Sequence, residues 1–139
     1  MPKKYSNAPS FSFGDSPKMA DDGARDVIAR KQVATCVALA FVENGTAAKP
    51  EVGLVEIILN GKTSPSCAIE TWKTDTQQYD QIDLQFALDE GCRDLKEWQD
   101  IHEAYFKRRN CFSPTMKIYR QYFNVIEVFE DVETVGISS

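Results

Sequence analysis

The chain has 139 residues, of which 42% are hydrophobic and 27% are charged, and its formal net charge at neutral pH is -5. This size and composition predict one folded domain and disfavour disordered and fibrous proteins. The acidic balance argues against a protein that wraps a long nucleic acid, because sequence-independent binding to phosphates depends on clustered Lys and Arg. A small ligand remains compatible with this charge.

The sequence also predicts where the protein works and which prosthetic groups it lacks. No apolar run approaches the ~20 residues needed to cross a bilayer, and the first residues lead into no apolar signal core. We therefore expect a cytoplasmic protein with no membrane association. The chain has one histidine and four widely spaced cysteines without a Cys-x-x-Cys pair. This pattern predicts free thiols, no metal site and no cofactor.

The N-terminal part of the chain predicts a lead-in, a helix and a strand. Residues 1–12 are polar and show no period, which is typical of a flexible lead-in. A helix is predicted from Pro17, with Ser16 as its N-cap, to about residue 30 or 31. Residues 33–42 are rich in Val, Ala and aromatic side chains and predict a buried strand that ends at a turn.

The rest of the chain predicts a hairpin, two helices and one or two C-terminal strands. Residues 52–59 and 66–72 flank Asn60-Gly61-Lys62, which is a strong hairpin signal. The helices and the C-terminal strand region are expected at residues 81–88, 95–108 and 116–129, the longer helix after a capping box. Helices that interrupt a mainly antiparallel sheet indicate an α+β or closed-barrel domain.

Four segments resemble the ASCH domain, a small PUA-like β-barrel associated with RNA and modified nucleosides. They are Phe13-Gly14-Asp15, the stretch Arg-Lys-Gln-Val-Ala-Thr at 30–35, the stretch Phe-Ala-Leu-Asp-Glu-Gly at 86–91, and the helical stripe Trp98, His102, Tyr105 and Phe106. The resemblance implies an ASCH domain over residues 13–130 and a C-terminal tail over 131–139. It implies a small barrel of mostly antiparallel strands with about three flanking helices.

The resemblance also implies a candidate catalytic set. In family members that look like N4-acetylcytidine amidohydrolases, a lysine and a threonine of the segment Gly-Lys-Lys-Thr-x-Thr act with a downstream glutamate. Thr35 and Glu90 fall at the matching positions, whereas Gln32 replaces the lysine. A carboxamide cannot exchange a proton near neutral pH. Lys31 could take this role only if the connection shifts register by one residue, because neighbouring side chains point in different directions.

Each of these residues has an ordinary structural alternative. Thr35 could be a strand threonine that bonds to backbone, Glu90 a carboxylate at a helix end, and Lys31 a solvated cation at the end of a helix. The stripe on the long helix is typical of core packing. We therefore interpret His102 as a packed, hydrogen-bonded histidine and not as a general base.

Further residues are candidates for ligand binding. Asp15 can accept hydrogen bonds, Gln32 occupies the pocket segment, and Tyr105 and Tyr122 could stack on a nucleobase. A local group of cations could hold a few phosphates, although a solvated helix end explains the same pattern. This group is Lys107, Arg108, Arg109, Lys117 and Arg120.

Three functional hypotheses follow. The first is an ASCH-domain protein whose central cleft binds a nucleoside, a nucleotide or short single-stranded RNA. The second is a hydrolase, similar to an N4-acetylcytidine amidohydrolase or a ribonuclease, that uses Thr35, Glu90 and Lys31. The third is an interaction or regulatory module whose pocket is closed by Phe41, Tyr122 and their neighbours. The sequence leaves open whether the protein is a monomer or a homodimer.

Overall fold

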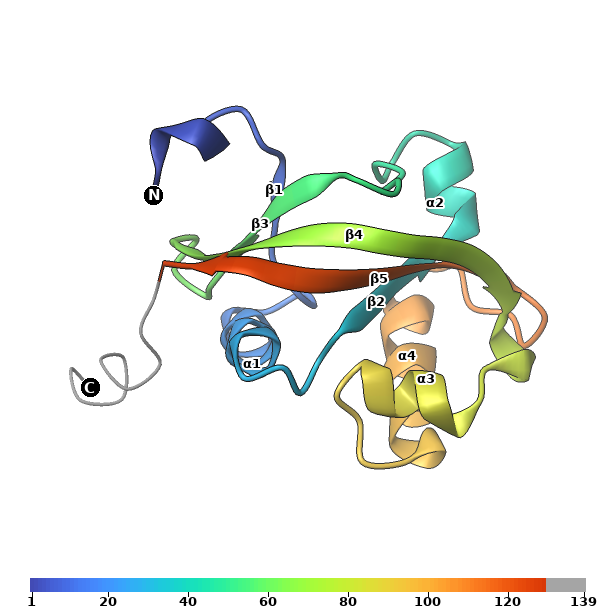
Figure 1. Cartoon of the computed structure of the whole chain (residues 1–139). Coiled ribbons are helices and arrows are strands. Elements are labelled where there is room, and N and C mark those ends of the chain that lie inside the picture. The colour runs from blue at the N-terminus through green and yellow to red at the C-terminus, as the bar shows by residue number, and fades with distance from the viewer. Residues whose placement is uncertain (130–139) are drawn as a thin grey trace.

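The structure, a computed structural model that describes residues 1–129, is an α+β fold built on one five-stranded sheet (Figure 1). The strand order is β1-β3-β4-β5-β2, and all neighbours are antiparallel except β1, which runs parallel to β3. The strands are β1 (Ser10–Phe11), β2 (Ala34–Ala38), β3 (Val55–Leu59), β4 (Pro65–Gln78) and β5 (Lys117–Val128).

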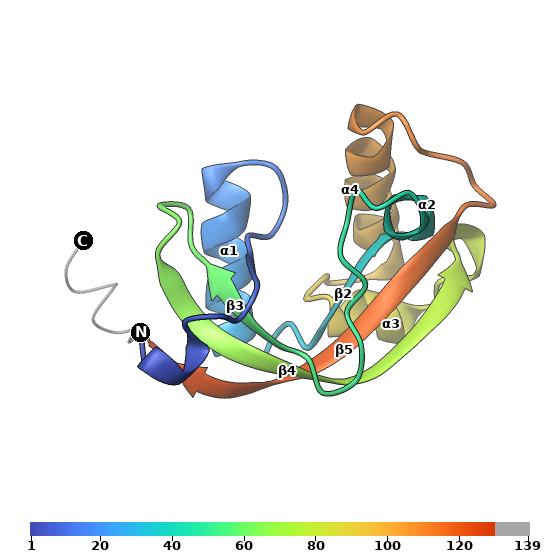
Figure 2. The same cartoon turned by 90° about the horizontal axis from the view of Figure 1, so that it is seen from above.

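The prediction of a closed barrel is wrong, because β1 and β2 form the two edges of the sheet and do not pair with each other. The sheet is strongly curved instead (Figure 2). The β4–β5 ribbon shifts register between Ala68 and Ile69 and again between Thr71 and Lys73, and such bulges bend a strand. Curvature therefore gives the sheet a concave face without closing it.

The described residues contain four α-helices, whereas about three were expected: α1 (Pro17–Ile28), α2 (Leu39–Glu43), α3 (Leu84–Asp89) and α4 (Leu95–Arg108). Side-chain caps begin three of them. Ser16, Asp83 and Asp94 each accept a hydrogen bond from the backbone N–H three residues further on. These caps confirm the predicted starts of α1 and α4.

The predicted strand at 33–42 is only half right. β2 ends at Ala38, and residues Leu39–Glu43 form α2. The last ladder pair joins Ala38 to Ile118, next to the start of β5, so the chain beyond Ala38 has no strand to pair with. The C-terminal run is a single strand, β5, which pairs with both β4 and β2.

Helices α1 and α4 stand on the same side of the curved sheet (Figure 2). Val27 of α1 packs with Ile58 and Phe123 of the sheet in one core cluster. Trp98 of α4 belongs to a second cluster, together with Phe86 of α3. These two separate cores hold the two helices at opposite ends of the sheet.

The first twelve residues, for which we expected a flexible lead-in, contact the sheet. Ser10 and Phe11 pair with β3, after a short 3-10 helix at Lys3–Tyr5. The Tyr5 side chain is buried, and its hydroxyl donates a hydrogen bond to Glu127 Oε1 at 2.9 Å. The predicted tail at residues 131–139 lies outside the described residues.

Candidate functional site

A cleft of about 720 Å³ is lined by residues of both α1 and α4. These two helices stand on the concave side of the sheet (Figure 2). The lining of this cleft comes from β2, β3 and β5, from the segment before α1, from α1 and α4 themselves, and from the turn after α3. Polar and aromatic side chains line it together: Gln32, Thr35, Glu56, Glu90, His102 and Gln121, with Phe13, Tyr105 and Tyr119.

Four of the nine predicted site residues meet in this cleft: Gln32, Thr35, Glu90 and Tyr105. The other five do not line it: Asp15, Lys31, Arg108, Arg120 and Tyr122. The segment that holds Gln32 lies beside the turn that follows α3, because the Val33 N–H donates a hydrogen bond to the Asp89 carbonyl at 2.7 Å. This contact brings two segments that are distant in sequence to one wall.

Strand alternation decides which residues of β5 reach the cleft, whereas Thr35, Cys36 and Val37 of the edge strand β2 all contribute to its lining. Thr35 pairs with Gln121, and both face the cleft. Arg120 and Tyr122 flank Gln121 in the strand and therefore point to the opposite face. There the Arg120 guanidinium lies 4.9 Å from the centre of the Phe86 ring.

Lys31 and Gln32 have opposite surroundings. Gln32 is buried, lines the cleft and donates a hydrogen bond from Nε2 to the Ala34 carbonyl at 3.1 Å. Lys31 is exposed and lies outside the lining. The register is therefore the one that places the carboxamide, and not the amine, in the pocket.

Most of the predicted basic group is neutralised by carboxylates. Arg108 forms a two-pronged ion pair with Asp15 at 2.9 and 3.2 Å, which lowers the pKa of Asp15. Lys107 pairs with Glu103, and Arg120 pairs with Asp75. Arg109 has no carboxylate partner within residues 1–129.

Arg109 lies instead over two aromatic rings. Its guanidinium is 5.3 Å from the centre of the Phe41 ring and 5.9 Å from that of Tyr105, which lines the cleft. Of the five predicted cations, Arg109 is thus the one that combines a position beside the cleft with an uncompensated charge. The sequence pattern did not distinguish it from its neighbours.

The floor of the cleft holds a polar network that the sequence analysis missed. Gln121 Nε2 donates hydrogen bonds to Glu56 Oε1 at 2.6 Å and to Thr71 Oγ1 at 2.8 Å. All three side chains are buried, and burial raises the pKa of Glu56, although the hydrogen bond from Gln121 acts the other way. The sequence does carry one signal of this network: Glu56 is a glutamate among apolar residues, at a position of β3 that faces the core.

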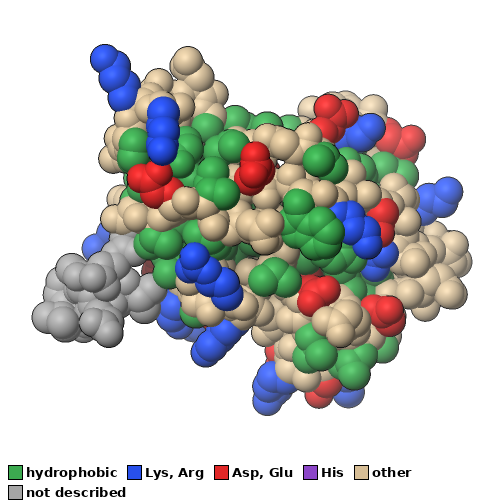
Figure 3. Space-filling view, in the orientation of Figure 1, with side chains coloured by type: hydrophobic (Ala, Val, Ile, Leu, Met, Phe, Trp, Pro, Cys, Tyr) green, Lys and Arg blue, Asp and Glu red, His purple; other side chains and the backbone are tan. Residues whose placement is uncertain are grey.

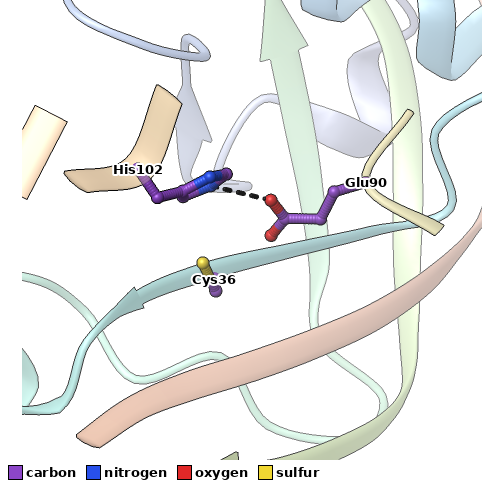
Figure 4. Close-up of side chains that lie close together, drawn as sticks. All are labelled: Cys36, Glu90 and His102. Carbon is purple, nitrogen blue, oxygen red and sulfur yellow. Dashed lines mark ion pairs between the residues drawn. The ribbon is translucent and has the colours of Figure 1, made fainter. Parts of the chain in front are cut away.

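A second polar cluster joins the turn after α3 to α4. Glu90 follows the last residue of α3, and its Oε2 accepts a hydrogen bond from Trp98 Nε1 at 3.0 Å. The same oxygen lies 2.8 Å from His102 Nε2 (Figure 4). The His102 ring stacks on Trp98, with 4.2 Å between ring centres, which agrees with the interpretation of a packed, hydrogen-bonded histidine.

The environment of this cluster shifts two pKa values. Burial alone would lower the pKa of His102, but the Glu90 carboxylate and the hydrogen bonds to Glu90 and the Trp98 carbonyl raise it overall. Cys36 lies next to this pair, and burial together with the Glu90 charge raises the pKa of its thiol well above the usual value. Glu90 Oε1 is buried and has no hydrogen-bond partner.

Gly14 is a point of close approach between the segment before α1 and the helix itself. Gly14 has a φ of 70°, and an added Cβ would lie 2.5 Å from the Met19 Cβ. Any other residue would be strained there and would collide with α1. The segment before α1 can therefore fold tightly against that helix beside the cleft.

Comparisons with known proteins agree with this architecture. The chain superimposes on the crystal structure of protein EF3133 from Enterococcus faecalis V583 with a TM-score of 0.82 and 28% identity, over 92% of this chain and 82% of that one. It superimposes on an ASCH domain from Lactobacillus crispatus JV V101 with a TM-score of 0.82 and 24% identity, over 90% and 83%. No curated protein matches the chain in sequence.

No helix within the described residues is long and apolar enough to cross a membrane.

Membership of a family rests on a further match. The family model described as the ASCH domain matches residues 9–133, which is most of the chain. The chain therefore belongs to the ASCH domain family.

Proposed function

We propose that the cleft binds a nucleoside, a nucleotide or the end of a short single-stranded RNA, with one base inserted between α1 and α4. The observation that carries this proposal is the hydrogen-bonded pair of Glu56 and Gln121 on the floor of a cleft of about 720 Å³, with Thr71, outside the lining, as the second acceptor for Gln121. Cleft volumes of about 300–1,000 Å³ with a few fixed polar groups are typical of small-molecule sites.

The network on the floor fixes which hydrogen bonds a ligand can make. Gln121 Nε2 uses both of its N–H donors, one on Glu56 and one on Thr71. The Gln121 carbonyl oxygen and the second Glu56 oxygen then remain as acceptors. Two neighbouring acceptors favour a base that offers an exocyclic amine over one that offers only a ring N–H.

The walls supply the flat contacts that a base requires. Phe13, Tyr105 and Tyr119 line the cleft, and stacking on an aromatic side chain contributes ~1 to 3 kcal/mol per base. The Tyr119 hydroxyl donates a hydrogen bond to the Pro50 carbonyl, which holds this ring in place. Arg109, beside Tyr105, can reach a phosphate at the mouth of the cleft.

The charge distribution favours a small ligand over a long nucleic acid. Three of the five cations near the end of α4 and on β5 are paired with carboxylates. On the face seen in Figure 3, Lys and Arg side chains are interspersed with Asp and Glu and form no continuous patch. A long duplex would require such a patch to replace its counterions.

Titration of the folded protein with cytidine, adenosine, uridine and a short single-stranded RNA tests the proposal. We expect cytidine and adenosine to bind more tightly than uridine, and Gln121→Leu to weaken binding at least tenfold. Lys31→Ala is the matched control, since Lys31 lies outside the lining and should leave binding unchanged. Absence of binding at millimolar ligand by the folded protein would remove the proposal.

Hydrolysis of an acylated cytidine or of RNA is the second candidate, because Thr35 and Glu90 line the same cleft. Gln32 occupies the lysine position of the motif and cannot move a proton near neutral pH. If turnover appears only in Gln32→Lys, the natural protein is a binder. If Thr35→Ala leaves a wild-type activity intact, Thr35 has no part in that chemistry.

The closed-pocket hypothesis receives no support from the cleft. Neither Phe41 nor Tyr122 lines it. Tyr122 instead lies on the opposite face of β5, where its ring is 5.8 Å from that of Trp72. An interaction module would therefore have to use another surface.

A further inference from the structure

Three side chains with metal-binding atoms converge on one wall of the cleft. The Cys36 sulfur, a Glu90 carboxylate oxygen and a His102 ring nitrogen lie within 4.8 Å of one another (Figure 4). They come from β2, the turn after α3 and α4, and all three line the cleft. Because these residues are far apart in the sequence, their spacing gave no metal signal, and no metal was expected.

The surroundings of His102 prepare its Nε2 as a ligand. Its Nδ1 lies 2.8 Å from the Trp98 carbonyl oxygen, which can only accept a hydrogen bond, so Nδ1 carries a proton. In the metal-free protein, Nε2 lies 2.8 Å from Glu90 Oε2 and shares a proton with that carboxylate, and release of this proton frees the Nε2 lone pair for a metal. Histidines that bind metals commonly donate their other N–H to a backbone carbonyl in this way.

Glu90 provides a second observation that favours a cation at this position. Its side chain is 5% exposed, and its Oε1 is buried without a hydrogen-bond partner. Its Oε2 is oriented by Trp98 Nε1 at 3.0 Å. A buried carboxylate oxygen without a partner is costly, and a cation bound to it would remove that cost.

We propose that Cys36, Glu90 and His102 form a Zn²⁺ site in which a thiolate, a carboxylate oxygen and an imidazole nitrogen supply three ligands and the fourth position faces the cleft. Three protein ligands with an open position are typical of zinc sites that act on a substrate. Sulfur and imidazole ligands favour zinc over magnesium or calcium, which prefer oxygen. Binding releases two protons to solvent, the thiol proton of Cys36 and the proton held between His102 Nε2 and Glu90, and it involves no redox change.

The observed spacing is compatible with this site. Zinc–ligand bonds of about 2.0 to 2.3 Å at tetrahedral angles place the ligand atoms about 3.2 to 3.8 Å apart. The His102 Nε2–Glu90 Oε2 separation of 2.8 Å lies just below this range and the other separations are at most 4.8 Å, so shifts of about 1 Å or less would complete the site. The inference stands independently of nucleoside binding, because metal affinity is measured without any other ligand.

The test uses the full chain after removal of metal with a chelator. Zn²⁺ alone is titrated in competition with a chromophoric chelator, and Co²⁺ alone is titrated while its absorption spectrum is recorded. We expect one Zn²⁺ per chain and, with Co²⁺, a charge-transfer band from the thiolate. Loss of groups that merely orient a ligand costs about 10- to 100-fold in metal affinity, so Cys36→Ser and His102→Gln should each cost at least about 100-fold.

Two further variants keep the result interpretable. Cys111→Ser removes a thiol that lies outside the cleft and should leave the affinity and the band unchanged. Glu90→Gln is nearly isosteric, so it tests the site even if another variant fails to fold. The proposal is overturned if the folded protein takes up no stoichiometric Zn²⁺, which would leave Glu90 Oε1 to a water or to the Cys36 thiol. It is also overturned if the cobalt band survives in Cys36→Ser.

Discussion

Replacement of Glu56 by glutamine should stabilise the protein, although it removes a charged group from a hydrogen-bonded network. Glu56 is 7% exposed, and the one partner that its carboxylate has within the network is Gln121 Nε2, at 2.6 Å. Burial raises the pKa of its carboxyl above the usual value of 4.5, so the folded state disfavours the charged form. In Glu56→Gln, a side-chain carbonyl can still accept the hydrogen bond from Gln121.

The sign and the size of the effect follow from the direction of this pKa shift. Because the folded pKa is raised, Glu56 contributes most to stability below pH 4.5, and that contribution is lost as the pH rises through the folded pKa. Each unit by which folding raises the pKa of this carboxyl corresponds to about 1.4 kcal/mol of free energy of unfolding. We expect Glu56→Gln to raise the free energy of unfolding at pH 8 by about 0.5–2 kcal/mol, the range of typical stabilising substitutions.

Thermal and denaturant unfolding of wild type and variant at pH 8 and at pH 4 measure this difference. For a chain of this length, 1 kcal/mol corresponds to a shift in Tm of about 3–5 °C. Glu51→Gln is the control, since it removes the same charge from an exposed side chain. The reasoning is refuted if Glu56→Gln gives no stabilisation at pH 8, or if it stabilises the protein equally at both pH values.

Three further substitutions test other parts of the structure. Gly23→Ala should lower the free energy of unfolding by ~1–2 kcal/mol and weaken ligand binding, because the new Cβ would lie 2.6 Å from atoms of Phe13 on the cleft wall. Chemical denaturation measures the first effect, and nucleoside titration measures the second. Arg108→Ala should lower the free energy of unfolding by less than ~1 kcal/mol, because the ion pair of Arg108 with Asp15 is exposed. Equal denaturation midpoints of wild type and variant at high salt would agree with this, since salt screens exposed charges. Lys31→Ala should leave any turnover of an acylated cytidine unchanged, and a loss of activity would restore Lys31 as a catalytic candidate.

Local sequence signals were sufficient for the helices that frame the cleft. Ser16 followed by Pro17 marks the start of α1, and Asp94 marks the start of α4, because a cap is formed by residues within one turn. The hairpin around Asn60-Gly61-Lys62 was predicted for the same reason, and its turn is held by the Asn60 side chain, whose Oδ1 accepts a hydrogen bond from the Lys62 N–H.

Position on a motif also indicated part of the cleft. The resemblance alone predicts that Thr35 and Glu90 share one pocket, and both residues line the cleft. Arg120 and Tyr122 are candidates by their chemistry alone, which does not give the direction of a side chain. The pairing of β2 with β5 decides that direction, since a shift of one residue moves a side chain to the other face.

The helix starts, the hairpin and the residue that replaces the motif lysine can be predicted from the linear sequence, because each of these depends on neighbours along the chain. Three features become visible only in the folded chain: the sheet stays open, Glu56 contacts Gln121 on the floor of the cleft, and Cys36 lies beside Glu90 and His102 on its wall. These contacts join residues that are distant in sequence. They depend on strand register, on bulges and on how two separate cores hold the helices, and no local pattern encodes those features.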